Sequence, residues 1–203
     1  MVGTTAVIRE NKAGKVPGGV DRVVVILGGK GSASAFRELL SGLRKGIQAP
    51  VIVLIDNDMG DIKGESSLFF GYPEIQWVSE DTGPQPLENG KIYMSLGLLG
   101  IDKEANLFSQ TAEDDTSRSD RILLQTARLF GKGVVAVILS CEDPVSATAI
   151  NSLLSSGGKC IVQDPSEAKY PQGPVSVLKH FEVDYLLHTS LIGFVLQGLV
   201  MKH

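Results

Sequence analysis

Short runs of consecutive apolar residues alternate along the chain with longer segments in which apolar residues recur at helical spacing. Residues 23–26, 51–55 and 134–139 are apolar runs rich in β-branched side chains, which is typical of strands buried in a parallel sheet. Residues 33–46 and 119–130 place an apolar side chain every three or four positions, which predicts amphipathic helices. The alternation predicts a three-layer α/β/α fold, doubly wound, with a mainly parallel sheet and helices on both sheet faces.

The second half of the chain continues this alternation, whereas the middle departs from it. Residues 146–156 are predicted as a helix and residues 159–162 as a strand, and a further helix and strand precede a closing helix from about Leu191. Between residues 76 and 107, short apolar stretches are separated by Gly, Asn and Asp. This pattern predicts a short β-hairpin insertion or a sheet edge that includes residues 91–95.

The length and composition indicate one domain. The chain has 203 residues, of which 43% are hydrophobic, enough for one well-packed core and too few for two large ones. Asn, Gly and Pro residues break any period in residues 1–20, so we expect a flexible leader there and a single domain over residues 21–203.

The net charge and the two cysteines indicate which kinds of partner and which cellular compartment to expect. The formal net charge of -4 argues against binding to nucleic acid or to an anionic membrane, so we expect protein or small-molecule partners. We find neither a signal peptide nor an apolar stretch as long as a membrane span. Cys141 and Cys160 fall at or near buried strands, and we interpret them as reduced thiols of a cytoplasmic protein.

The junction after the first strand, residues 22–36, has the shape of a binding loop. Its glycines permit a sharp turn into the next helix, which we expect Ser32 or Ser34 to cap. Backbone N–H groups would then point at one spot beside the positive end of the helix dipole, which suits a small anion. The predicted ligand-binding residues are Gly28, Gly29, Lys30, Gly31 and Ser32. The alternative is a turn needed only for packing a helix on a strand.

Three loops follow the carboxyl ends of predicted strands, where ligands bind in sheets of this kind: residues 28–32, 56–60 and 140–146. Acidic side chains in or directly after these loops match no metal motif, so we expect solvated carboxylates, no metal and no cofactor. These side chains are Asp56, Asp58, Asp61, Glu142 and Asp143.

With these loops in view, the chain resembles the catalytic domain of the CheB family of chemotaxis receptor methylesterases, which also deamidate receptor glutamines. The resemblance covers most of the chain from about Arg22, and Gly173-Pro174 stands where the family usually has Met-Pro. It depends on four local matches in the right order: Phe36-Arg-Glu-Leu-Leu40, Gly90-Lys-Ile-Tyr-Met94, Ser119-Asp-Arg-Ile-Leu123 and Gly157-Gly-Lys-Cys-Ile-Val-Gln-Asp164.

The resemblance also implies where a Ser-His-Asp triad would stand. The family's serine falls at Gly29, its histidine at Asp56 or Asn57, and its aspartate at Val145. A glycine cannot attack an ester, and neither Asp nor Asn can replace imidazole as a proton shuttle near neutral pH. The resemblance therefore implies a catalytically degenerate member of the family.

Two alternatives would supply a relocated nucleophile. Ser32 or Ser34 could pair with Lys30, and Cys141 could act from the end of the third long apolar run. The three loops contain no histidine, and we expect His180, in a helix-like segment, and His188, in the last strand, to be structural.

Three functions remain open at this point. The first is a binding or regulatory module with a protein partner in bacterial chemotaxis-like signalling. The second is an active hydrolase of the protein-glutamate methylesterase or deamidase type. The third is a sensor of a small ligand or anion.

Overall fold

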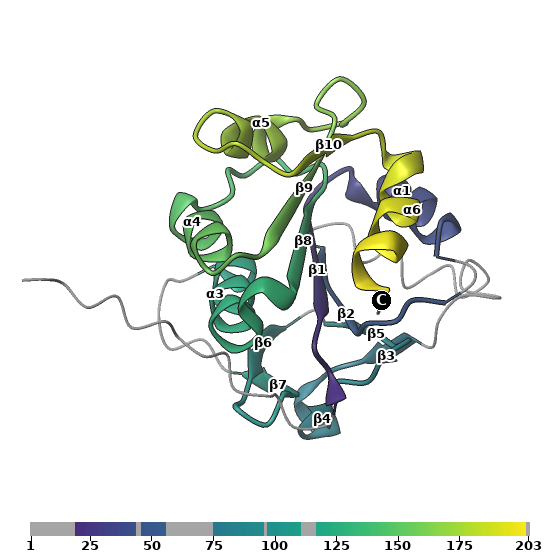
Figure 1. Cartoon of the computed structure of the whole chain (residues 1–203), viewed down its shortest axis with the longest axis vertical. Helices are drawn as coiled ribbons and strands as arrows, with labels where there is room; N and C mark the ends of the chain where they lie inside the picture. Colours follow the sequence, from purple (N-terminus) through teal and green to yellow (C-terminus); the bar gives the residue numbers. More distant parts are fainter. Residues whose placement is uncertain (1–18, 44–45, 56–74, 96, 111–116, 202–203) are drawn as a thin grey trace, which may run out of the picture.

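The computed structural model describes residues 19–43, 46–55, 75–95, 97–110 and 117–201, and its centre is a parallel sheet (Figure 1). The strand order in this seven-stranded sheet is β10-β9-β8-β1-β2-β5-β3, and every neighbouring pair is parallel. The strands are β1 (Val23–Gly28), β2 (Val51–Ile55), β3 (Ile75–Trp77), β5 (Ile92–Met94), β8 (Val134–Ile138), β9 (Lys159–Gln163) and β10 (Tyr185–Leu187).

Helices cover both faces of this sheet, which confirms the predicted three layers (Figure 1). One face carries α1 (Ser32–Ser41) and α6 (Thr189–Val200), which pack on each other. The other carries α3 (Arg118–Phe130) and α4 (Ala147–Ser155), with α5 (Gln172–Leu178) beside β9.

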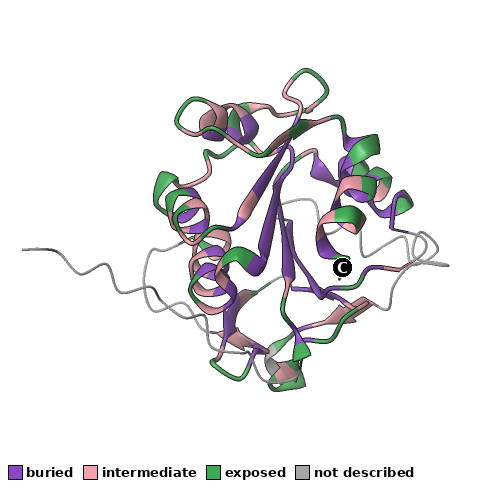
Figure 2. Ribbon diagram, viewed as in Figure 1, coloured by how far each residue is buried: buried purple, intermediate pink, exposed green. Residues whose placement is uncertain are grey.

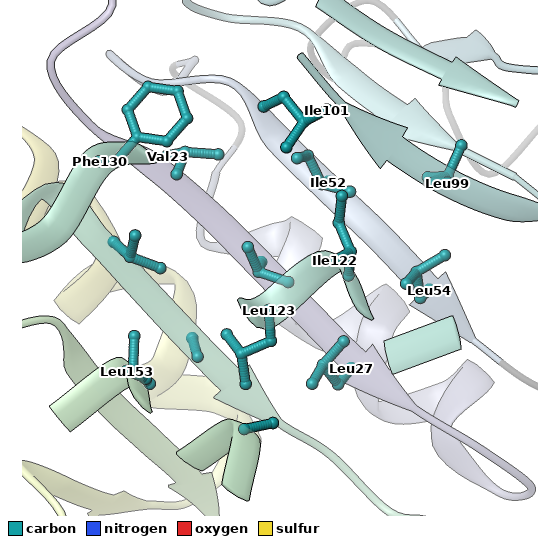
Figure 3. Packing of buried hydrophobic residues seen from close by; sticks show 14 of the residues in the cluster. Val23, Leu27, Ile52, Leu54, Leu99, Ile101, Ile122, Leu123, Phe130 and Leu153 are labelled. Atoms are coloured by element: carbon teal, nitrogen blue, oxygen red, sulfur yellow. The ribbon is translucent and has the colours of Figure 1, made fainter. Parts of the chain in front are cut away.

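The central strand β1 shows why its sequence is apolar at every position. Val23, Val25 and Leu27 face the core under α3 and α4, and Figure 3 shows Ile122 and Leu123 of α3 on that side of the sheet. Val24 and Ile26 face the core under α1 and α6. Because both faces are covered, the strands form a buried layer inside exposed helix surfaces (Figure 2).

The middle of the chain divides between two sheets. Residues 92–94 form β5, which lies between β2 and β3 in the main sheet and not in the insertion that the sequence predicts. Ile92, Tyr93 and Met94 are fully buried, as in an interior strand. The predicted hairpin is real but lies further on: β6 (Leu98–Ile101) and β7 (Asn106–Gln110) pair antiparallel, and β4 (Gln85–Pro86) joins β7.

Helix α1 ends at Ser41, whereas the sequence predicts a helix that continues to Gly46. The described residues also include two short 3-10 helices, η3 (Glu80–Thr82) and η4 (Gly131–Gly133). Gly42 directly follows α1 and faces Gly193 of α6. A Cβ on Gly193 would lie 2.8 Å from the Gly42 Cα and 2.4 Å from the Leu39 carbonyl oxygen, so the two helices could not approach as closely if Gly193 had a side chain. The crossing therefore depends on two facing glycines.

The remaining expectations concern the leader and the membrane. Residues 1–18 lie outside the described residues, while Val20, which the expected leader included, is 2% exposed and packs into the core. Among the helices that the structure describes, none combines the length and apolar character needed to cross a membrane.

Candidate functional site

The candidate site lies at the carboxyl ends of β1, β8 and β9, on the side of the sheet where α5 begins (Figure 1). Three segments meet there: the turn at residues 28–32, the loop at residues 140–146, and residues 164–171, which we call the strap. The third loop of the prediction, with Asp56, Asn57, Asp58 and Asp61, lies outside the described residues.

Hydrogen bonds to both backbone polar groups of Gly29 fix the turn after β1. The Gly29 N–H donates to the Ser140 carbonyl oxygen at 2.9 Å. The Gly29 carbonyl oxygen accepts from the Ser32 N–H at 3.1 Å and from Ser32 Oγ at 2.7 Å. Two N–H groups of the predicted anion cradle thus already have backbone partners, and Gly29 itself is buried.

Neither Ser32 nor Ser34 caps α1, although the sequence analysis expects one of them to do so. The N-cap is Gly31, with φ of 82° and no side-chain cap, and Ser32 is the first helical residue. Its hydroxyl is fully buried on Gly29, and a Cβ on Gly28 would lie 2.6 Å from Ser32 Oγ. Ser34 is exposed in the first turn of α1.

Ser140 joins all three parts of the site, a role that the sequence analysis missed. Its Oγ donates toward the Lys30 carbonyl oxygen at 3.1 Å and accepts from the Tyr170 N–H at 2.9 Å. Its own N–H donates to Gln163 Oε1 at 2.7 Å. The available signal was a serine placed directly after an apolar run that predicts a buried strand, since polar groups buried there need partners.

Charged groups lie at the surface of the site. Lys30 Nζ is 3.1 Å from Glu142 Oε1 and 5.0 Å from the centre of the Tyr170 ring. The hydrogen bond to Glu142 raises the pKa of Lys30 above its usual value, with a smaller contribution from Tyr170. Lys169 Nζ is 5.9 Å from the same ring. Lys30 is therefore held in its protonated form.

Cys141 follows β8 as predicted, in surroundings that disfavour a thiolate. Burial raises the pKa of the Cys141 thiol to about 11, and the negative charge of Asp143 adds to this effect. Its N–H donates to the Tyr170 carbonyl oxygen at 3.0 Å. Its Sγ fills space that Gly173 leaves free, because a Cβ on Gly173 would lie 1.9 Å from that sulfur.

Alkylation of Cys141 is therefore expected to be slow at neutral pH. Because the thiolate is the reacting species, the rate should rise about tenfold per pH unit from pH 7 to pH 10. Iodoacetamide labelling, localised to Cys141 by peptide mass spectrometry, measures the rate, and the urea-unfolded protein supplies the unperturbed control. A rate that levels off by pH 8 would instead identify an activated thiol.

His188 is not in the last strand, where the sequence analysis placed it, but follows β10 as the N-cap of α6. Its Nδ1 is 3.0 Å from Glu167 Oε2, and its Nε2 is 3.7 Å from Asp164 Oδ2. Glu167 Oε1 also accepts from the Thr189 N–H at 2.6 Å and from Thr189 Oγ1 at 2.5 Å. Glu167 therefore serves as a remote cap for the N-terminus of α6.

Burial alone would raise the pKa of Glu167, but the hydrogen bonds from Thr189 and His188 outweigh it and hold that pKa below its usual value. The ionised carboxylate is thus the form that the cap uses. His180, the other histidine that the structure describes, follows α5, with its ring 6.5 Å from that of Phe181. Of the two histidines that the structure describes, His188 thus contacts Glu167 of the strap and His180 contacts Phe181 after α5.

Val145 begins the approach to α4. It is partly buried against the core, and its N–H donates to Ser176 Oγ at 3.1 Å. An apolar side chain with a structural contact thus occupies the position where the resemblance implies the triad aspartate.

Comparisons with known proteins agree with this architecture. A family model described as CheB methylesterase matches residues 24–196. The structure is similar to the crystal structure of the Thermotoga maritima CheB methylesterase catalytic domain, with a TM-score of 0.70 and 20% sequence identity. The match covers 88% of this chain and 98% of that one, and it confirms the predicted fold. No curated protein matches the chain.

Proposed function

Since the chain belongs to the CheB methylesterase family, we propose that it is a catalytically degenerate member that acts as a binding or regulatory module. Its partner would be a protein of a bacterial chemotaxis-like signalling system in the cytoplasm. The main support is Gly29, at the position where the resemblance implies the nucleophilic serine. Gly29 has no side chain and is buried, its N–H donates to Ser140 in the loop after β8, and its carbonyl oxygen accepts from Ser32.

The environments of the other nucleophiles support the same proposal. The Ser32 hydroxyl is buried and donates to Gly29, so it faces the protein and not a substrate. The pKa of Cys141, raised to about 11, leaves the thiol protonated near neutral pH. A serine–lysine pair with Ser34 would need Lys30 as a base, yet Glu142 raises the pKa of Lys30, and a lysine base requires the opposite shift.

The exposed groups of the site are suited to a protein surface. Lys30 and Glu142 have side chains that are 48% and 44% exposed and form an ion pair at the surface of the site, where Lys30 lies beside the Tyr170 ring. An exposed ion pair contributes little to stability because solvent screens it, so charged side chains of a partner can compete for either member. Opposite charges at adjacent points also favour one orientation of the partner.

A binding experiment with a methylated cytoplasmic fragment of a chemoreceptor tests this proposal. The domain is expected to co-sediment with the fragment and to leave the mass of the recovered receptor unchanged. The double variant Lys30→Glu, Glu142→Lys preserves the ion pair in reverse and should weaken binding. Loss of methyl ester from the receptor, or equal binding by the reversed pair, would contradict the proposal.

A further inference from the structure

We infer that the strap, residues 164–171, covers the buried part of the candidate site and must open locally before a partner held at the exposed Lys30–Glu142 pair reaches Gly29 and Ser140. The role of the partner rests on the proposed function, whereas the cover itself is argued from contacts within the chain. Those contacts are made by Tyr170 near one end and by Asp164 and Glu167 in the other half, and none of residues 164–171 is buried in the core.

One end of the strap is held on the site. The Tyr170 N–H donates to Ser140 Oγ at 2.9 Å, and the Tyr170 carbonyl oxygen accepts from the Cys141 N–H at 3.0 Å. Lys30 Nζ lies 5.0 Å from the centre of the Tyr170 ring. Tyr170 thus joins the loop after β8 to the turn after β1.

The other end is held on α6. The Asp164 N–H donates to the Leu187 carbonyl oxygen at 2.9 Å, and Glu167 accepts from the N–H and the hydroxyl of Thr189. These bonds end on β10 and α6, whereas those of Tyr170 end on the loop after β8, so one end can release while the other remains attached.

The fit between the strap and the turn depends on Gly31. A Cβ on Gly31 would lie 2.8 Å from Lys169 Cβ and 2.8 Å from Tyr170 Cδ2, closer than real side chains approach. The strap therefore lies directly on a backbone that has no side chain at the point of contact.

The burial pattern favours local opening. Gln163, at the end of β9, is 3% exposed, whereas each residue from Asp164 to Tyr170 is partly or fully exposed. A segment held by a few hydrogen bonds, without a buried apolar side chain, opens at a lower free energy than the core. Its opening would remove the backbone contact of Cys141 while leaving the fully buried Cys160 in β9 protected.

A pair of glycine substitutions isolates the strap contact. Gly31→Ala adds a methyl group against Lys169 and Tyr170 at a φ of +82°. Gly90→Ala imposes the same kind of backbone strain at a φ of +86°, but its Cβ would meet only the Ile47 carbonyl oxygen at an ordinary 3.7 Å. The two variants therefore share the strain and differ in the contact.

The readouts are alkylation of the two cysteines at one fixed pH and hydrogen exchange of the Cys141 and Tyr170 amides. In Gly31→Ala the added methyl group should push the strap open more often, because opening relieves its contact with Lys169 and Tyr170. We therefore expect Cys141 alkylation and the exchange of both amides to be roughly tenfold faster than in the original protein and in Gly90→Ala. Cys160 should remain slow in all three proteins.

Equal Cys141 rates in Gly31→Ala and Gly90→Ala would overturn the inference, as would labelling of Cys141 and Cys160 at the same rate, which indicates global unfolding. No receptor is present in this experiment. A failed cover therefore leaves the proposed binding function standing, and a failed binding assay leaves the cover standing.

Discussion

Replacing Gly193 by alanine is expected to lower the free energy of unfolding by about 3 kcal/mol. The added Cβ would lie 2.4 Å from the Leu39 carbonyl oxygen and 2.8 Å from the Gly42 Cα. Both are backbone atoms of the α1 segment, so no side-chain rotation relieves the contact and the two helices must separate. Since α1 and α6 together cover one face of the sheet, their separation also loosens the core around Phe36. Chemical denaturation followed by circular dichroism measures the change.

Gly198→Ala on the same helix is the matched control. A Cβ at Gly198 meets nothing within 4 Å, so this substitution should stabilise the domain by roughly 0.5 to 1 kcal/mol through helix propensity. Equal effects of the two substitutions would show that the close approach of α1 and α6 is not what requires Gly193.

Replacing Gln163 by leucine is expected to cost about 3 kcal/mol of stability. Gln163 accepts from the Ser140 N–H at 2.7 Å and donates to Thr189 Oγ1 at 3.1 Å, and all three residues are buried. A leucine of similar size would leave a backbone donor and a hydroxyl without these partners, and each unsatisfied buried group carries a penalty. The free energy of unfolding, measured by urea titration, gives the effect.

Gln125→Leu provides the comparison, because Gln125 is only partly buried and accepts a single bond from the Ile101 N–H at 3.0 Å. We expect a loss of about 1 kcal/mol there. If Gln163→Leu lowers the free energy of unfolding by no more than Gln125→Leu does, then the two hydrogen bonds of Gln163 do not hold the carboxyl ends of β8 and β9 to α6.

The main sheet could be predicted from the sequence because local pattern and burial agree. Residues 51–55 read as a buried strand, and all five are buried in β2. The same holds for β8, whose two faces are both covered. The sheet to which β5 belongs could not be read in this way. A three-residue apolar segment fits a hairpin or an interior strand equally well, and its place depends on pairing with β2 and β3 far along the chain.

The site shows the same division. The turn at residues 28–32 was found because glycines mark it, but its cap was wrong: Ser32 turns back to Gly29, and Gly31 holds the N-cap. Ser140, Gln163 and Tyr170 were missed because their contacts connect residues 23 to 110 positions apart. The spacing of residues along the sequence does not indicate such a network. A search for polar residues at the ends of predicted buried strands would have included Ser140 and Gln163.

The hydrogen bonds of Ser140 show that this residue has a structural role in the site. Ser140 joins the turn, the strap and β9 through its hydroxyl and its N–H. Its hydroxyl is therefore a structural connection, even though it lies at the carboxyl end of a strand where catalytic groups are commonly found. A polar residue in that position is evidence for catalysis only after its partners are known.

Release of methanol from a methylated chemoreceptor tests the central claim most directly. The purified domain is compared with Gly29→Ser, Cys141→Ala and an active CheB methylesterase. The account predicts no release above the blank from the domain or from Cys141→Ala, and none from Gly29→Ser, since a hydroxyl alone lacks a base. Release by the unaltered domain would contradict the account, and its loss in Cys141→Ala would identify that thiol as the nucleophile.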